Sequence, residues 1–312
     1  MRILLTGGAG FIGSHLANYL ADQGHQVGIL DRTRDLRAFE KNYHHHEGHP
    51  ERFYCFDCRE LPFILKASDW DYCYHLASTV GVPNVLSDPR ECIENIIEST
   101  RAVLRLGIPG MYFSTSEVYG KKTGYLSEDS DCVISPKSRW SYAGAKLCSE
   151  WLALAENWKV VRLFNVIGPG QNKAYGAVVP KFVELIKASH PVPVHGDGSQ
   201  KRTFTSVFDV VKILDKLRDK PFQVVNVGSQ NTVSIKDLAY SIRRICKSFS
   251  PICFVPYGKV FANGFEECPE RVPDLTRLRS LIGEFKFQEL DNILEGLVQG
   301  ENTWEHSLQM TR

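Results

Sequence analysis

The sequence predicts an α/β fold built on a doubly wound parallel sheet, and three observations support this. Short apolar runs of strand length alternate with helix-length amphipathic segments over residues 1–165. The first run leads directly into three glycines spaced by three residues, Gly7, Gly10 and Gly13. After residue 165, prolines and glycines divide the chain into short pieces, which predicts a smaller, discontinuous C-terminal lobe.

Residues 1–5 are expected to form a buried strand, and residues 11–21 the helix that follows it. Between them, one glycine permits the tight turn, one lets backbone approach a pyrophosphate, and one lets the helix pack closely on the strand. The helix would point its first amides at the anion. This is typical of a Rossmann-type dinucleotide-binding domain. The candidate cofactor-binding residues here are Gly7, Gly10, Phe11, Ile12 and Gly13.

The second strand, residues 26–30, leads into Asp31, which lies 18 residues after Gly13. A carboxylate at this place would bind the ribose hydroxyls of the adenosine. It would also repel a 2′-phosphate, so NAD is favoured over NADP. Arg32, a further cofactor-binding candidate, weakens that preference because it would attract the same phosphate.

The remaining elements continue the alternation. Residues 32–51, which include His44, His45, His46 and His49, are polar and predict a surface connection. The predicted strands are 52–56, 71–75, 110–113 and 159–164, and the predicted helices are 59–66, 88–106 and 138–157. In such sheets, ligands bind beyond the carboxyl ends of the strands. Residues 1–165 would therefore form the NAD-binding domain.

Residues 166–312 are expected to form mainly the substrate-binding lobe. Its predicted helices are 179–187, 208–218, 233–247 and 288–297, and a strand near 223–228 is expected to return to the main sheet. The whole chain carries a net charge of +1 without long runs of one sign, which argues against a nucleic-acid or membrane surface. Its apolar stretches are far shorter than a membrane span.

Cysteine usage indicates a reducing compartment. The nine cysteines are scattered through predicted strands and helices, as expected of buried thiols in a cytoplasmic protein. The first predicted strand begins at residue 1, so we expect no signal peptide. Cys55 and Cys58 form an isolated C-x-x-C pair without two further ligands at zinc spacing, and we therefore predict no metal site.

The predicted helix from residue 138 carries the candidate chemistry. Tyr142 and Lys146 are four residues apart and share one helical face. An ammonium beside a phenol would lower the tyrosine pKa from about 10, so that Tyr142 could act as a base nearer neutral pH. Lys146 could also hold the nicotinamide ribose. Thr115 or Ser116, at the end of the preceding strand, would complete a proton relay.

These motifs together resemble the extended short-chain dehydrogenase/reductase family, the NAD-dependent nucleotide-sugar epimerases, dehydratases and decarboxylases. The resemblance spans nearly the whole chain and rests on GGAGFIG, Asp31, Asp57, HLAS, Asn95, STSEVYG, YAGAK, RLFNVIGPGQ, GDGSQKRTFTSVFD and RVPD. It implies that Asp57 lies near the adenine and that Leu76, Ala77 and Asn95 line the cofactor path. It further implies that Asn165 contacts the substrate, and that Arg202 and Arg271 hold the nucleotide diphosphate or nucleoside.

The family chemistry implied here begins with removal of the sugar C4 hydroxyl proton by Tyr142 while hydride passes from C4 to bound NAD. The 4-keto sugar is then re-reduced with inversion, dehydrated or decarboxylated. Ser116 stands where 4,6-dehydratases carry an acidic aspartate, which disfavours that reaction. Thr115-Ser116-Glu117 and Arg139 resemble the UDP-glucuronate decarboxylases, and Arg139 could pair with a substrate carboxylate.

The substrate loop resembles the epimerases instead, since residues 175–181, including Val178 and Lys181, follow their pattern. The sequence therefore favours a UDP-glucuronate decarboxylase-like enzyme, with a 4-epimerase as the alternative and a dehydratase third. A non-catalytic NAD-binding sensor is disfavoured because both Tyr142 and Lys146 are retained. We expect a UDP-sugar substrate, and a homodimer formed by the helices near 89–106 and 138–157.

Overall fold

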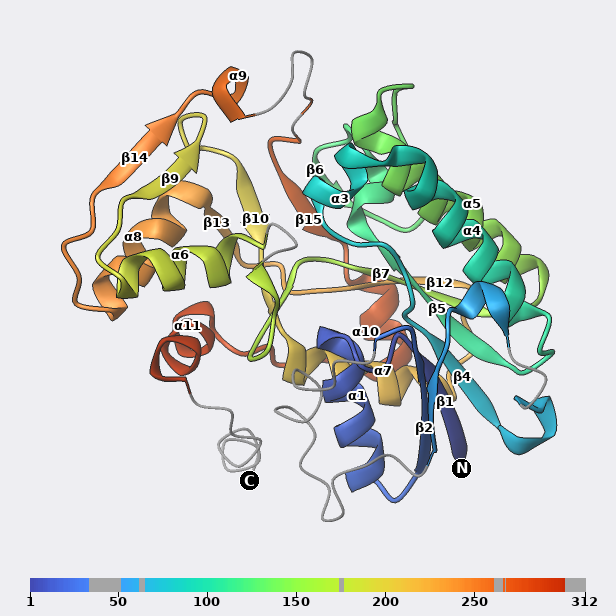
Figure 1. The fold of residues 1–312 in the computed structure, drawn as a ribbon. Helices are drawn as coiled ribbons and strands as arrows, with labels where there is room; N and C mark the ends of the chain where they lie inside the picture. The colour runs from blue at the N-terminus through green and yellow to red at the C-terminus, as the bar shows by residue number, and fades with distance from the viewer. Residues whose placement is uncertain (34–51, 62–64, 174–176, 261–265, 267, 301–312) are drawn as a thin grey trace.

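A computed structural model describes residues 1–33, 52–61, 65–173, 177–260, 266 and 268–300. Within these residues, a seven-stranded parallel sheet runs in the order β12-β7-β5-β4-β1-β2-β3 (Figure 1). Its strands are β1 (Arg2–Thr6), β2 (Gln26–Asp31), β3 (Arg52–Cys55), β4 (Tyr72–His75), β5 (Gly110–Thr115), β7 (Lys159–Leu163) and β12 (Val224–Val227). The predicted doubly wound α/β architecture is confirmed.

The sheet is buried on both faces, which explains why its strands are apolar at nearly every position. Along β1, Ile3 and Leu5 pack on one face, while Leu4 belongs to the opposite one. The first face is covered by α1 (Phe11–Asp22), α7 (Val207–Arg218) and α10 (Thr276–Ile282). The second face is covered by α4 (Pro89–Leu104) and α5 (Ser141–Ala155), which lie side by side on the outside of the molecule (Figure 1).

Local sequence signals account for several helix boundaries. Asp88 caps α4 by accepting a hydrogen bond from the Glu91 amide at 2.9 Å, and Pro89 occupies the first turn. A short helix that we did not predict, α3 (Val82–Ser87), precedes it. The helix predicted over residues 59–66 is wrong: the described residues there form only a 3₁₀ turn, Cys58–Glu60. Leu61 precedes a proline, which disfavours helical backbone at that residue.

The second lobe has its own small core. The lobe contains α6 (Val178–Lys187), β9 (Val192–His195), α8 (Ile235–Ile245), β14 (Ile252–Val255), α9 (Tyr257–Val260) and α11 (Leu290–Gln299). Phe182, Leu238 and Leu294 are buried together at its centre. A strand pair, β10 (Lys201–Thr203) with β13 (Thr232–Ser234), lies between this core and the main sheet (Figure 1).

Two further strand pairs connect the lobe to the sheet domain. β15 (Arg271–Pro273) pairs with β6 (Gly124–Leu126), and β8 (Val166–Ile167) pairs with β11 (Thr205–Ser206). The boundary that we place at residue 165 stays a prediction. The four histidines between residues 44 and 49 lie outside the described residues. Among the described helices, none combines the length and the apolar character of a membrane span.

Candidate active site

The glycine-rich turn between β1 and α1 has the geometry that a dinucleotide requires. Gly7 has a φ of +69°, and a Cβ atom there would lie 2.7 Å from the Ala77 amide nitrogen. A Cβ atom on Gly13 would lie 2.7 Å from Gly8 Cα and would overlap the Gly7 carbonyl oxygen. Gly10 is the N-cap of α1 without a side-chain cap, so the first amides of the helix can face an anion. These residues fit the pyrophosphate of NAD.

A methyl group at residue 13 tests this fit. We expect Gly13→Ala to lower the free energy of unfolding by about 1–3 kcal/mol through overpacking. The displaced turn should also raise the Kd for NAD about tenfold or more, which corresponds to about 1.4 kcal/mol of binding free energy. The matched control is Gly296→Ala, on α11, where a Cβ would meet nothing within 4 Å. Isothermal titration with NAD measures both variants, and an unchanged Kd for Gly13→Ala would contradict the assignment.

Asp31 stands beside the glycine turn, at the carboxyl end of β2. Its carboxylate accepts hydrogen bonds from the amides of Ala9 and Thr33, both at 3.1 Å. Burial raises the Asp31 pKa, and these two hydrogen bonds partly offset the effect. The neighbouring Arg32 is exposed. This arrangement holds the carboxylate at the end of the sheet where we expect the ribose.

The other candidate cofactor residues lie around the same edge of the sheet. Leu76 and Ala77 directly follow β4, and the Leu76 amide donates to the Thr6 carbonyl at 3.0 Å. Asn95 is buried on α4, and its Oδ1 accepts a hydrogen bond from the Thr79 hydroxyl at 3.1 Å. Asp57 forms an ion pair with Arg59 at 2.9 Å, which lowers the Asp57 pKa.

The end of β5 meets the start of α5 and forms the candidate catalytic cluster. Thr115 accepts a hydrogen bond from the Glu117 amide at 3.2 Å, which starts the 3₁₀ turn η3 (Ser116–Tyr119). This turn packs against α5, and Thr115 forms a hydrogen bond with Tyr142 that lowers the tyrosine pKa. Ser116 is buried in the turn. The structure thus brings Thr115, Glu117 and Tyr142 together.

The expected lowering of the Tyr142 pKa below its ordinary value is wrong for the chain alone. Burial raises the pKa of Tyr142, and the nearby Glu117 carboxylate raises it further. The Lys146 ammonium, which we expected beside the phenol, donates instead to the Phe113 carbonyl at 2.7 Å and lies 4.8 Å from the centre of the Tyr112 ring. A spacing of four residues places two side chains on one face but does not make them touch.

Lys146 is itself strongly perturbed. Burial lowers its pKa to about 7, and the carboxylate of Glu150 opposes that shift. Glu150, one turn further along α5, forms a buried ion pair with Arg162 at 2.7 Å and accepts a hydrogen bond from Ser114 at 2.5 Å. Sequence patterns did not single out this pair. The ion pair fixes α5 to β7, and the Ser114 hydrogen bond fixes α5 to the end of β5, directly before Thr115.

Glu117 lies between two arginines. Its Oε2 is 2.9 Å from Nη2 of Arg139, and its Oε1 is paired with Nη1 of Arg271. Burial would raise the Glu117 pKa, but Arg271 and Arg139 outweigh it and hold the pKa at about 2. Glu117 is therefore ionised at neutral pH. The three groups carry one positive charge in excess, beside Tyr142.

Arg271, which we expect to hold the nucleotide diphosphate or nucleoside, lies beside Glu117, and its role toward a nucleotide stays a prediction. Its side chain is 3% exposed and also donates to the Gly120 carbonyl at 3.2 Å. The pairing of β15 with β6 causes this, because β6 begins four residues after Gly120. Glu117 and Arg271 are 154 residues apart, so no local pattern could connect them.

The remaining substrate candidates belong to the second lobe and its connections. Asn165 is exposed and donates to the Thr203 carbonyl at 2.9 Å. Arg202, on β10, donates to the Lys201 carbonyl at 2.7 Å. Val178 and Lys181 lie in the first turn of α6, just after residues 174–176, which are outside the described part. Their roles toward a substrate stay predictions.

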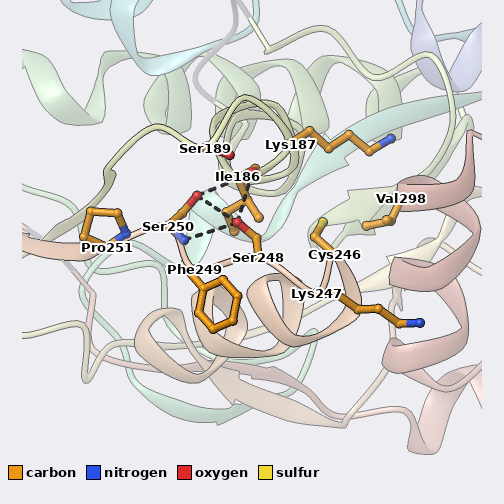
Figure 2. A pocket seen from close by; sticks show the side chains of 10 residues that line it. All are labelled: Ile186, Lys187, Ser189, Cys246, Lys247, Ser248, Phe249, Ser250, Pro251 and Val298. Carbon is orange, nitrogen blue, oxygen red and sulfur yellow. Dashed lines mark hydrogen bonds between the residues drawn. The ribbon is translucent and has the colours of Figure 1, made fainter.

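A hollow of about 470 Å³ lies at the far end of this lobe, where α6, α8 and α11 end (Figure 2). The hydroxyls of Ser248 and Ser250 both donate to the Ile186 carbonyl, at 3.2 and 3.3 Å, and Phe249 is 99% exposed. None of its ten lining residues belongs to the predicted site. The candidate active site is therefore the cluster around Tyr142 and Glu117.

Several known proteins resemble this chain in sequence and in fold. A model of the NAD dependent epimerase/dehydratase family matches residues 3–228. The chain is 36% identical to the UDP-N-acetyl-alpha-D-glucosaminuronate decarboxylase of Bacillus cytotoxicus, over 90% of this chain and 91% of that protein. It is 31% identical to UDP-glucuronic acid decarboxylase 1 of Danio rerio, over 90% of this chain and 68% of that protein. The solved structure of a UDP-N-acetylglucosamine 4-epimerase from Methanobrevibacter ruminantium superposes with a TM-score of 0.81 at 26% identity, over 96% of this chain and 97% of that one.

Proposed function

Because this chain belongs to the NAD-dependent epimerase/dehydratase family, we propose that it decarboxylates a UDP-linked uronic acid through a 4-keto sugar. The observation that carries the proposal is Glu117 between Arg139 and Arg271, beside Tyr142. Arginine recognises carboxylates by paired, charge-assisted hydrogen bonds. The two decarboxylases at 36% and 31% identity support the same reaction.

The first step needs a base at the sugar C4 hydroxyl. Tyr142 takes this proton, and Thr115 supports the phenolate by the hydrogen bond that lowers the tyrosine pKa. Bound NAD would supply the chemistry of a hydride acceptor for C4, and in its reduced form that of a hydride donor. The glycine turn, Asp31 and Lys146 are the residues that would hold it. The positive nicotinamide ring would counteract the Glu117 charge, which raises the pKa of Tyr142.

The second step breaks the bond between C5 and the carboxylate. With a ketone at C4, the electron pair of this bond moves to the C4 oxygen, carbon dioxide leaves, and C5 then takes a proton. Two arginines alone would stabilise the carboxylate more than the transition state, in which its charge is leaving, and that would slow the step. Glu117 offsets one of their charges. The site can thus orient the carboxylate without holding its charge too strongly.

The alternative is a 4-epimerase, which would use Tyr142 and Thr115 for the same oxidation. The likeness to a 4-epimerase at 26% identity favours it as the second candidate. Mass spectrometry and proton NMR of three separate reactions, with UDP-glucuronate, UDP-N-acetylglucosaminuronate and UDP-glucose, distinguish the two. We expect carbon dioxide and a shortened sugar from at least one uronate and no change of UDP-glucose. A product of unchanged mass with inverted C4 would show the epimerase instead.

We also propose that the enzyme is a cytoplasmic homodimer. All nine cysteines, which lie in the described residues, are free thiols. On the α4–α5 pair, Trp151 is 61% and Ile93 38% exposed, which suits contact with the same two helices of a second copy.

A charge on this face tests the dimer. Trp151→Glu should raise the dimer dissociation constant roughly thirtyfold or more, because a buried interface tryptophan contributes about 2 kcal/mol or more. Phe249→Glu, in the second lobe, is the matched control, since Phe249 is also exposed. Size-exclusion chromatography with light scattering measures both. Dimers that persist in Trp151→Glu, or a monomeric wild type, would contradict the proposal.

A further inference from the structure

Glu266 connects the segment before β15 to the rim of the candidate active site. Its Oε1 accepts hydrogen bonds from Nζ of Lys121 at 2.8 Å and of Lys137 at 2.9 Å. Its Oε2 accepts from the Ser135 hydroxyl at 2.8 Å and from the Trp140 indole nitrogen at 2.7 Å. All four donors come from the sheet domain. One carboxylate thus gathers donors from two loops and from η4 (Ser138–Trp140).

The contact with Trp140 leads directly to the arginine–carboxylate cluster. The Trp140 side chain is 2% exposed, and a buried indole N–H needs an acceptor, which Glu266 supplies. The guanidinium of Arg139 lies 4.7 Å from the centre of the Trp140 ring. Arg139 in turn pairs with Glu117 at 2.9 Å. Glu266 therefore positions the Trp140 ring, against which the Arg139 guanidinium packs.

A second contact connects the neighbourhood of Glu266 with Glu117, through Arg271 on β15. Arg271, five residues after Glu266, pairs with Glu117 and donates to the Gly120 carbonyl. Lys121, which Glu266 binds, directly follows Gly120. Arg271 and Glu266 thus bind Gly120 and Lys121, which are adjacent in one loop. Glu266 therefore contributes to the placement of both arginines that flank Glu117.

We propose that Glu266 is a positioning residue that holds Trp140 and Arg139 in place for the carboxylate of the substrate. This inference rests on the proposed function. Glu266 does not touch the reacting atoms; it sets the preference of the site for a uronate over the uncharged sugar. Removing it should weaken binding of UDP-glucuronate and leave binding of UDP-glucose unchanged, because the two ligands differ only at C6, which is a carboxylate in the first and a hydroxymethyl group in the second. A general structural role would weaken both.

The experiment compares the Kd values of the NAD-loaded enzyme for UDP-glucuronate and UDP-glucose by isothermal titration, in a Tyr142→Phe background that prevents turnover of the uronate. Glu266→Ala removes the acceptor, and Trp140→Phe removes the indole N–H together with part of the ring beside Arg139. We expect each to reduce the preference for the uronate about tenfold, which corresponds to 1.4 kcal/mol. The double variant should lose little more, since both act through one contact. Glu284→Gln, at a surface ion pair with Arg279, is the control and should keep the wild-type preference.

Two results would overturn this inference alone. The first is a wild-type preference that survives Glu266→Ala. The second is an equal loss of affinity for both ligands, with or without a lower Tm, because that indicates a general structural role. Should Glu266→Ala fail to fold, Trp140→Phe gives the same comparison. A wild type that does not prefer UDP-glucuronate to UDP-glucose would overturn the proposed function, and this inference with it.

Discussion

Tyr142→Phe is expected to lower kcat about a thousandfold, within the range that a positioned general base contributes. The substitution removes only the hydroxyl that takes the C4 proton, so the ring at residue 142 still packs against Cys92, Ile96 and Ala145. Turnover of the uronate is measured by carbon dioxide release. The Kd for NAD should change little, because the glycine turn and Asp31 remain.

Tyr125→Phe is the matched control, since Tyr125 lies on β6 and is 72% exposed. It should keep the wild-type kcat. If Tyr142→Phe retained a large part of the wild-type turnover with NAD bound, another group would have to remove the proton. The role assigned to the Tyr142 phenol would then be wrong.

Arg271→Met should produce the second large effect. It leaves the Glu117 carboxylate in a buried site with Arg139 as its remaining cation, and breaking a buried ion pair from one side costs about 3–5 kcal/mol. We expect kcat/KM for the uronate to fall at least about a hundredfold, together with a lower Tm. Steady-state kinetics and thermal unfolding measure the two effects.

Arg279→Met controls for the loss of an arginine, because Arg279 lies on α10 with a side chain that is 45% exposed. Its kcat/KM and Tm should stay near the wild-type values. Glu117→Gln combined with Arg271→Met separates stability from function. The double variant should recover part of the lost Tm, since no carboxylate that has lost one of its two arginine partners remains, but it should not recover turnover. Recovery of both would show that Arg271 serves only to neutralise Glu117.

The parts of the site that are local in sequence could be predicted. The glycine turn, Asp31 at the end of β2, and the polar residues that follow β5 each depend on one strand and its next few residues. The alternation of apolar runs likewise predicted the parallel sheet, because strands buried on both faces must be apolar throughout.

The contacts between distant segments could not be predicted. Glu117 meets Arg271 because β15 pairs with β6, and Glu266 meets Trp140 from 126 residues away. Neither contact leaves a pattern in the sequence. The pKa of Tyr142 was predicted wrongly for a related reason. It depends on burial and on Glu117 rather than on the helical neighbour Lys146.

The most direct test of the proposed reaction is proton NMR of UDP-glucuronate, or its N-acetylated analogue, turned over in deuterium oxide. Loss of carbon dioxide from a 4-keto sugar leaves C5 to take its new hydrogen from solvent. We therefore expect a decarboxylated sugar that carries one deuterium at C5. A uronate with inverted C4 and no deuterium at C5, or a decarboxylated sugar without deuterium, would contradict it.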